Sequence, residues 1–220
     1  MTYLLAGGLW MPPTVWDPIV PRLEGAVPVT LPGQGDGNTA ATLEDQVAAI
    51  VAAVDAATDR VVVVGHSAAC SLAWLAADRR PGRVAAVALI GGLLPDNGQK
   101  YADLFPITDG LMPFPGWEPF EGPDSDDLSP AQRASLAEAA IPVPEGVARG
   151  VVRLTDERRF DVPVAAICPE FTPAQAREWI EAGDTPETAL AKHLDLIDID
   201  SGHWPMVTKP AELAAILAAI

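Results

Sequence analysis

The fold follows from the stretch Val61-Val62-Val63-Val64-Gly65-His66-Ser67-Ala68-Ala69. Four consecutive valines with no polar residue predict a strand that is buried on both faces, as in the middle of a parallel sheet. The residues after them predict a tight turn and then a helix, in which Leu72, Leu75 and Ala76 recur at helical spacing. This helix should end before Pro81. A strand, turn and helix in this order indicate an α/β protein.

Further β-rich runs flank this unit on both sides of the sequence. They lie at Tyr3–Ala6, Val27–Leu31, Val84–Ile90, Val162–Ile167 and Leu194–Ile199. Because they alternate with helical patterns, we expect a doubly wound, mostly parallel sheet of about six strands in the order 2-1-3-4-5-6. An amphipathic helix should begin after Thr42, which forms a capping-box pattern with Asp45, and a C-terminal helix should cover one face from Pro210 to Ile220.

The segment from about residue 93 to residue 160 interrupts this alternation. It is rich in proline and aspartate, with one helical pattern from Pro130 to Ala140. Disordered segments are poor in aromatic residues, so the apolar side chains in this segment favour an ordered lid. They are Met112, Phe114, Trp117 and Phe120. We therefore expect one α/β domain over residues 1–220, with a lid inserted at about 93–160.

Composition excludes several classes of function. The chain has 220 residues, of which 49% are hydrophobic, enough for one buried core. Its net charge of -16 disfavours binding to nucleic acid or anionic lipid. No apolar run reaches the roughly 18 residues of a membrane span, and Met1–Leu5 lacks the positive charge of a signal peptide. We expect a cytoplasmic protein whose two cysteines, Cys70 and Cys168, are buried and unpaired.

Gly65-His66-Ser67-Ala68-Ala69 follows a strand and opens a helix, which is the context of a nucleophile elbow. Such a turn is strained and exposes the serine Oγ, and its flanking residues must be small; Ala69 replaces the usual last glycine. A strand end followed by a serine-capped helix would have a similar sequence. The loop Ser201–Pro205 follows the last strand, so His203 should lie at the same edge as Ser67.

The glycine pair in Gly7-Gly8-Leu9 follows the first strand. It lets the backbone bend so that the amide of Leu9, together with the amide of Ala68, could form an oxyanion hole beside Ser67. A plain tight turn would also explain the glycines. In the expected strand order, however, the ligand crevice falls between the first and third strands, which carry these two motifs.

These motifs occur in an order that resembles the α/β-hydrolase superfamily. Besides the elbow and the glycine turn, the motifs in this order are Leu31-Pro32-Gly33-Gln34-Gly35 and Gly202-His203-Trp204-Pro205. The resemblance covers nearly the whole chain, which begins at what would be the third strand of the family. It is greatest for small bacterial esterase-like members, which also resemble plant methyl-ester hydrolases and hydroxynitrile lyases. The resemblance implies a serine hydrolase that needs no metal or other cofactor.

The acid is where the sequence departs from the family pattern. The family commonly places an aspartate where this chain has Thr172, and a second family position falls near Gly91. Neither residue can act as an acid. The remaining candidates are Glu170 and Asp96. We favour Glu170 because it follows the carboxyl end of its strand, where a carboxylate could meet His203.

The sequence therefore favours a serine hydrolase acting on a small, largely apolar ester, with Ser67 as nucleophile, His203 as base and Glu170 as acid. Its only expected partner is this small molecule. A hydroxynitrile-lyase-like enzyme and a non-catalytic small-molecule binding protein are the alternatives on the same scaffold. The residues expected to contact the substrate are Gly8, Trp10, His66, Trp117 and Trp204.

Overall fold

The computed structural model describes all 220 residues and contains a six-stranded sheet. Every neighbouring pair of strands is parallel, and the order β2-β1-β3-β4-β7-β8 is the one predicted from the sequence. The strands are β1 (Thr2–Ala6), β2 (Ala26–Pro28), β3 (Val61–His66), β4 (Val84–Ile90), β7 (Val164–Cys168) and β8 (Leu194–Asp198). The predicted α/β fold is confirmed.

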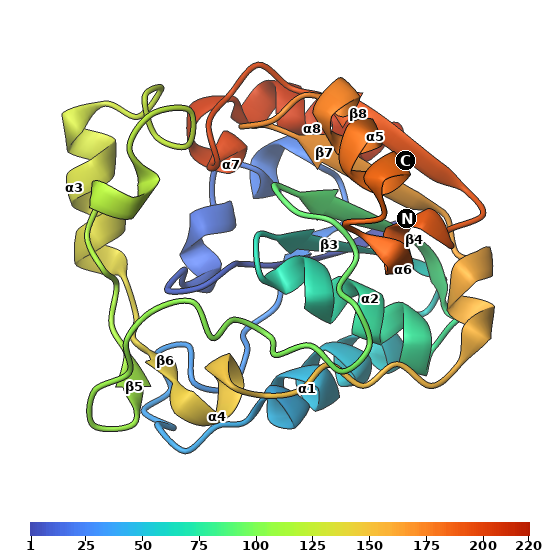
Figure 1. Ribbon diagram of the computed structural model, residues 1–220, viewed down its shortest axis with the longest axis horizontal. Coiled ribbons are helices and arrows are strands. Elements are labelled where there is room, and N and C mark those ends of the chain that lie inside the picture. Colours follow the sequence, from blue (N-terminus) through green and yellow to red (C-terminus); the bar gives the residue numbers. More distant parts are fainter.

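Helices cover both faces of the sheet, with α1 (Leu43–Ala56) and α2 (Ala69–Arg79) on one side and α8 (Pro210–Ala218) on the other (Figure 1). This explains why all six residues of β3 are buried. Helix α1 begins with the predicted capping box, in which the Asp45 amide donates to the Thr42 hydroxyl and the Thr42 amide donates to the Asp45 carboxylate.

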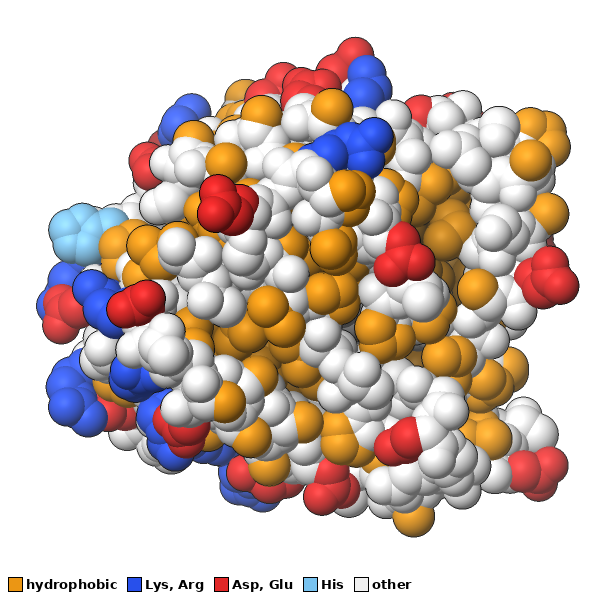
Figure 2. Space-filling view, turned by 180° about the vertical axis from the view of Figure 1, so that it is seen from behind, with side chains coloured by type: hydrophobic (Ala, Val, Ile, Leu, Met, Phe, Trp, Pro, Cys, Tyr) orange, Lys and Arg blue, Asp and Glu red, His pale blue; other side chains and the backbone are white.

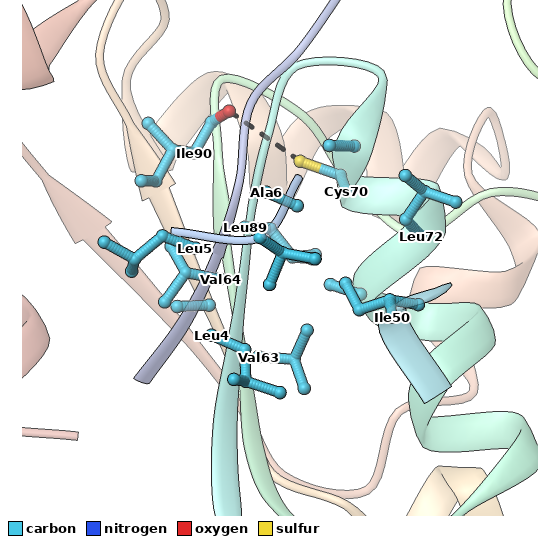
Figure 3. Packing of buried hydrophobic residues seen from close by; sticks show 14 of the residues in the cluster. Leu4, Leu5, Ala6, Ile50, Val63, Val64, Cys70, Leu72, Leu89 and Ile90 are labelled. Carbon is cyan, nitrogen blue, oxygen red and sulfur yellow. Dashed lines mark hydrogen bonds between the residues drawn. The ribbon is translucent and has the colours of Figure 1, made fainter. Parts of the chain in front are cut away.

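The core forms where the helices meet the strands. Figure 3 shows Ile50 of α1 and Leu72 of α2 pointing towards side chains of the central strands, among them Val63 and Leu89. All four are fully buried. Burying an aliphatic side chain of this size contributes about 1.5–3 kcal/mol, so this cluster fixes the position of α2 on β3 and with it the turn between them.

Both cysteines are free and buried, as predicted. Burial raises the pKa of the Cys70 thiol to about 12 and that of Cys168 to about 11. The Cys70 Sγ lies 3.3 Å from the Gly65 carbonyl oxygen and 3.7 Å from that of Ile90, so its S–H can donate a weak hydrogen bond to either; Figure 3 shows the contact with Ile90. The two thiols are therefore packing groups with little reactivity.

The connection between β4 and β7, for which we predicted a lid, lies to one side of the sheet and is called the lid below (Figure 1). The predicted helix is present as α3 (Pro130–Ala139). The lid also contains a two-stranded antiparallel ribbon and short helical turns that the sequence did not suggest, because elements of two to five residues show no periodicity. They are β5 (Leu111–Met112), η3 (Glu118–Phe120), β6 (Val143–Pro144), α4 (Glu145–Ala148) and η4 (Glu157–Asp161).

A buried polar cluster fixes the place where the lid returns to the sheet. Glu187 accepts hydrogen bonds from Arg159 Nε at 2.7 Å and from Trp74 Nε1 at 2.8 Å. Asp78, on α2, accepts from the Thr155 amide at 2.8 Å. Because both carboxylates are buried and hydrogen-bonded, removing a charged partner would leave an uncompensated charge, so these contacts anchor the lid at this end.

The remaining helices are α5 (Pro173–Ala182), α6 (Pro186–Ala189), α7 (Pro205–Thr208) and the 3-10 helices η1 (Pro13–Trp16) and η2 (Val20–Arg22). Helix α5 was not predicted, although Thr172 and Gln175 form a capping box and Pro173 occupies the first turn. Thr172 therefore caps a helix at the position where the family commonly has its acid. No helix combines the length and apolar character required to cross a membrane.

The lid leaves a groove at the back of the molecule, where Figure 2 shows a hollow lined with hydrophobic side chains. A cavity of ≈ 220 Å³ lies here between α3, η1 and α7. It is lined by Pro12, Thr14, Val15, Pro18, Gln132, Ser135, Leu136, Ala139 and Val207. None of the predicted site residues is among them, so the groove is separate from the candidate site.

Candidate active site

The predicted site residues gather at one edge of the sheet because the carboxyl ends of parallel strands share an edge. Leu9 follows β1 and Ser67 follows β3. Glu170 follows β7, and His203 follows β8. Four segments that are far apart in the sequence therefore contribute to one site.

Ser67 lies in a strained turn between β3 and α2. Its φ of 54° is in the left-handed region, which residues with a Cβ seldom adopt. The turn is held by a 2.8 Å hydrogen bond from the Ser67 amide to the Ile90 carbonyl. A Cβ on Gly65 would overlap the carbonyl of Ala69, so only glycine lets α2 start this close to the strand. The predicted elbow geometry is thus present.

His203 and Glu170 meet through their side chains. Nδ1 of His203 lies 2.8 Å from Oε1 of Glu170, and both side chains are mostly buried. A carboxylate only accepts, so Nδ1 carries the proton and Nε2 keeps the lone pair that a general base needs. The structure has no hydrogen bond between Ser67 Oγ and His203; bonds of this kind are often long in unliganded enzymes.

The structure distinguishes the two candidate acids. Asp96 accepts a hydrogen bond from the Glu187 amide at 3.1 Å, at the start of α6, and makes none with His203. Gly91 lies beside Glu170 and His203. A Cβ on Gly91 would be 2.9 Å from His203 Nδ1 and 3.3 Å from Glu170 Oε1. The second family position for an acid is therefore glycine in this chain because Glu170 and His203 fill the space beside it.

The two predicted oxyanion donors have no partner within the protein. Neither the Leu9 amide nor the Ala68 amide donates a hydrogen bond to another protein group. Gly8 brings the first of them close to the nucleophile, because a Cβ on Gly8 would lie 2.9 Å from the Ser67 Cβ. Ala68 sits at the N-terminus of α2, where the helix dipole also favours negative charge. Both amides are free to bind a developing oxyanion.

His66, which we expected to contact the substrate, points into the protein. It is only 1% exposed, and its Nε2–H donates to the His203 carbonyl at 2.7 Å. Burial, together with the nearby charge of His203, lowers the pKa of His66 to about 3, so the ring is neutral. Its Nδ1 is buried without a partner. His66 therefore holds the main chain of the His203 loop through a hydrogen bond made inside the protein.

The aromatic residues expected near the substrate form a continuous series of contacts from Trp10, which follows Leu9, to His203. Ring centroids lie 5.5 Å apart between Trp10 and Phe114, 5.3 Å between Phe114 and Trp117, and 5.3 Å between Trp117 and Trp204. The Trp204 ring is 5.0 Å from that of His203. The lid aromatics thus pack against residues on both sides of the predicted catalytic groups, and this series is called the aromatic roof below.

A small cavity lies beside the segment from Gly7 to Trp10. It measures ≈ 20 Å³, about the room one water needs, and Gly8, Leu9 and Trp10 form part of its wall. Gln46 and Tyr101 also line it and are more than nine-tenths buried. Burial raises the pKa of Tyr101, so its hydroxyl stays neutral and can donate a hydrogen bond.

Sequence reasoning missed two lid aspartates that bind the main chain of the His203 loop. The His203 amide donates to the Asp124 carbonyl at 2.7 Å, and the Gly202 amide donates to Asp127 Oδ2 at 2.8 Å. Burial raises the pKa of the Asp124 carboxyl, and the charge of His203 opposes this rise. An acidic run such as 124–127 is typical of a solvated loop, so no local signal marked these contacts. No group of three or more His, Cys, Asp or Glu side chains is arranged to hold a metal ion.

Comparison with known proteins agrees with the fold. The model of the alpha/beta hydrolase family matches residues 3–216. Lipase LipV from Mycobacterium tuberculosis is 28% identical over 229 residues, which cover 92% of this chain and 86% of the lipase.

Solved structures show the same fold at low sequence identity. An extracellular alpha/beta-hydrolase from a Paenibacillus species, described as sharing structural and functional homology with tobacco salicylic acid binding protein 2, has a TM-score of 0.79 at 18% identity and covers 100% of this chain and 98% of its own. A methylesterase from Arabidopsis has a TM-score of 0.74 at 16% identity, with coverage of 100% and 98%. A pyrethroid hydrolase from Sphingobium faniae has a TM-score of 0.73 at 18% identity, with coverage of 100% and 96%.

Proposed function

The chain belongs to the alpha/beta hydrolase family, and from this premise we propose that it is a serine hydrolase of small, largely apolar carboxylic esters. The observation that carries the proposal is the 2.8 Å contact between His203 Nδ1 and Glu170 Oε1 at the edge of the sheet that holds Ser67. It gives the histidine the tautomer of a general base. In this proposal Glu170 takes the place of the family's usual aspartate.

In the first half of the reaction, His203 Nε2 takes the proton from Ser67 Oγ as the oxygen attacks the ester carbonyl. The carbonyl oxygen becomes negative and accepts hydrogen bonds from the Leu9 and Ala68 amides. Glu170 stabilises the imidazolium. The imidazolium then gives its proton to the leaving alcohol oxygen as the carbon–oxygen bond breaks, which leaves an acyl group on Ser67.

In the second half, water attacks the acyl carbon and His203 Nε2 takes the proton of that water. The acid is released as the proton returns to Ser67 Oγ, so the enzyme is regenerated without any cofactor. Each donor of an oxyanion hole supplies about 3–4 kcal/mol of transition-state stabilisation, so the Leu9 and Ala68 amides would make a large contribution to the rate.

The aromatic roof supports an apolar substrate. Trp10, Trp117 and Trp204 belong to one series of ring contacts that runs from the residue after Leu9 to the ring of His203. No lysine or arginine contacts the predicted catalytic residues, and the net charge is -16, so an anion would gain little here. Relatives named as a lipase, a methylesterase and a pyrethroid hydrolase are in keeping with ester hydrolysis.

The alternatives differ in what happens at Ser67. The absence of the family's usual aspartate favours a non-catalytic binding protein. The contact of Glu170 with His203 weighs against this alternative, because it supplies a carboxylate at the histidine. A lyase would use Ser67 and His203 for proton transfer and form no acyl-enzyme.

The test is turnover of short-chain p-nitrophenyl esters by the wild-type chain, Ser67→Ala and Ser71→Ala. Ser71 lies on α2, the helix that begins just after Ser67, and its hydroxyl makes no hydrogen bond to the protein, so it is a matched control. We expect Ser67→Ala to lose about 10⁶-fold in kcat, as in other serine hydrolases, and Ser71→Ala to keep its activity. Equal turnover by Ser67→Ala and the wild type would refute the proposal.

A further inference from the structure

The main chain of His203 is held on both sides although its loop contains no regular structure. Its amide donates to the Asp124 carbonyl at 2.7 Å, and its carbonyl accepts from His66 Nε2 at 2.7 Å. With Glu170 bound to the ring, every polar group of the residue except Nε2 has a partner. One of these partners, Asp124, belongs to the lid.

The preceding residue is bound to the lid as well. The Gly202 amide donates to Asp127 Oδ2 at 2.8 Å. A Cβ on Gly202 would overlap both the Asp124 carbonyl and Asp127 Oδ1. Because Gly202 has no side chain, the lid turn that contains Asp124 and Asp127 can lie directly on the loop before His203.

The lid turn that provides these acceptors is itself rigid. The fully buried Ser125 donates from its hydroxyl to the Phe120 carbonyl at 2.6 Å. Arg133 of α3 donates to the Ser125 carbonyl at 2.6 Å, and its guanidinium lies 5.7 Å from the centre of the Trp117 ring. The turn is thus tied to α3 and to the aromatic roof, and it moves only if they move with it.

We propose that Asp127 is a positioning residue, which docks the lid turn onto the Gly202-His203 loop and so sets the alignment of the base with Ser67. Assembly of the base then depends on lid docking, which makes the lid part of the catalytic machinery as well as a cover over the substrate. This inference rests on the proposed role of His203. Catalytic groups must be held within a fraction of an ångström, and a displacement of about 1 Å can cost about 100-fold in rate.

The neighbouring Asp126 provides a matched control. Both aspartates are exposed and carry the same charge, but the Asp126 side chain makes no hydrogen bond or ion pair. Asp127→Asn is a conservative variant, because its amide oxygen can still accept from the Gly202 amide. A merely electrostatic role would make Asp126→Ala resemble Asp127→Ala and would make Asp127→Asn as poor as alanine.

The experiment measures kcat and KM for p-nitrophenyl acetate and the melting temperature of Asp127→Ala, Asp127→Asn, Asp126→Ala and Ser67→Ala. We expect Asp127→Ala to lose about 10- to 100-fold in kcat with KM changed less than about twofold, because substrate binding is left intact. Asp127→Asn should recover most of this loss, and Asp126→Ala should match the wild type.

The outcomes separate the two proposals. An unchanged kcat in folded Asp127→Ala, with Ser67→Ala inactive, would overturn the positioning role and leave the hydrolase proposal standing. Activity in Ser67→Ala would overturn the hydrolase proposal itself. If Asp127→Ala does not fold, Gly202→Ala replaces it, since its methyl group would push the same lid turn away; a wild-type kcat in that variant would also overturn the inference.

Discussion

The nucleophile and the base are positioned in different ways. The elbow around Ser67 is built from contiguous residues, with β3 on one side and α2 on the other, and its main chain is strained. The loop around His203 lies between β8 and the short helix α7, and it contains no residue with a positive φ. It is held by His66, Glu170 and the lid residues Asp124 and Asp127, each from a distant part of the chain. Local sequence therefore determines the nucleophile, whereas tertiary contacts determine the base.

Apart from removal of the nucleophile itself, the largest effect should come from Glu170, the side chain that holds His203. In Glu170→Gln the amide can donate to Nδ1 and so stabilise the wrong tautomer of His203. We expect kcat for p-nitrophenyl acetate to fall by about 10⁴-fold while the fold is retained. Circular dichroism and steady-state kinetics would check this.

Asp96→Asn is the control for Glu170→Gln, since Asp96 was the other candidate acid and binds the start of α6. It should keep the wild-type kcat. An inactive Asp96→Asn beside an active Glu170→Gln would reverse the assignment of the acid.

A change in the elbow should instead act on stability. A Cβ at Gly65 would overlap the Ala69 carbonyl and lie 2.7 Å from the Cys70 nitrogen, both main-chain atoms that cannot rotate away. We expect Gly65→Ala to lower the free energy of unfolding by about 3 kcal/mol or more, measured by urea denaturation.

Gly82→Ala is the matched control, because a Cβ there would meet nothing within 4 Å and the residue has no positive φ. Its stability should stay within about 0.5 kcal/mol of the wild type. Similar losses in both variants would show that the elbow is not specially constrained.

The smallest effect concerns the pH dependence of stability through His66. Its pKa is 6.5 in an open chain and about 3 in the folded protein, so between these pH values the unfolded chain binds a proton that the folded chain does not. The contribution of the neutral His66 to the free energy of unfolding is therefore complete above pH 6.5. It is lost progressively as the pH falls from 6.5 towards 3. The slope is about 1.4 kcal/mol per pH unit.

Glutamine at position 66 would keep a donor for the His203 carbonyl but would not titrate. Urea unfolding of wild type and His66→Gln at about pH 7, 6 and 5 should therefore give stability curves that converge towards acid pH. Parallel curves would contradict a buried, neutral His66.

The same contrast explains what the sequence could predict. The apolar runs gave six strands in the right order, and the elbow and the Gly7-Gly8 turn were recognisable because each lies within a few adjacent residues. Glu170 could be favoured only by its place after β7. The contacts of Asp127 and the burial of His66 were not predictable, because they depend on how the lid packs on the His203 loop and no local pattern records that packing.

The central claim is that Ser67 forms an acyl-enzyme, and trapping that intermediate tests it most directly. The protein would be mixed with p-nitrophenyl acetate, quenched with acid during turnover, digested and mapped by mass spectrometry. We predict an acetyl group on the peptide that contains Ser67 in the wild type, and none on the matching peptide of Ser67→Ala. Rapid turnover with no acetylated Ser67 would contradict the account and favour chemistry without a covalent intermediate.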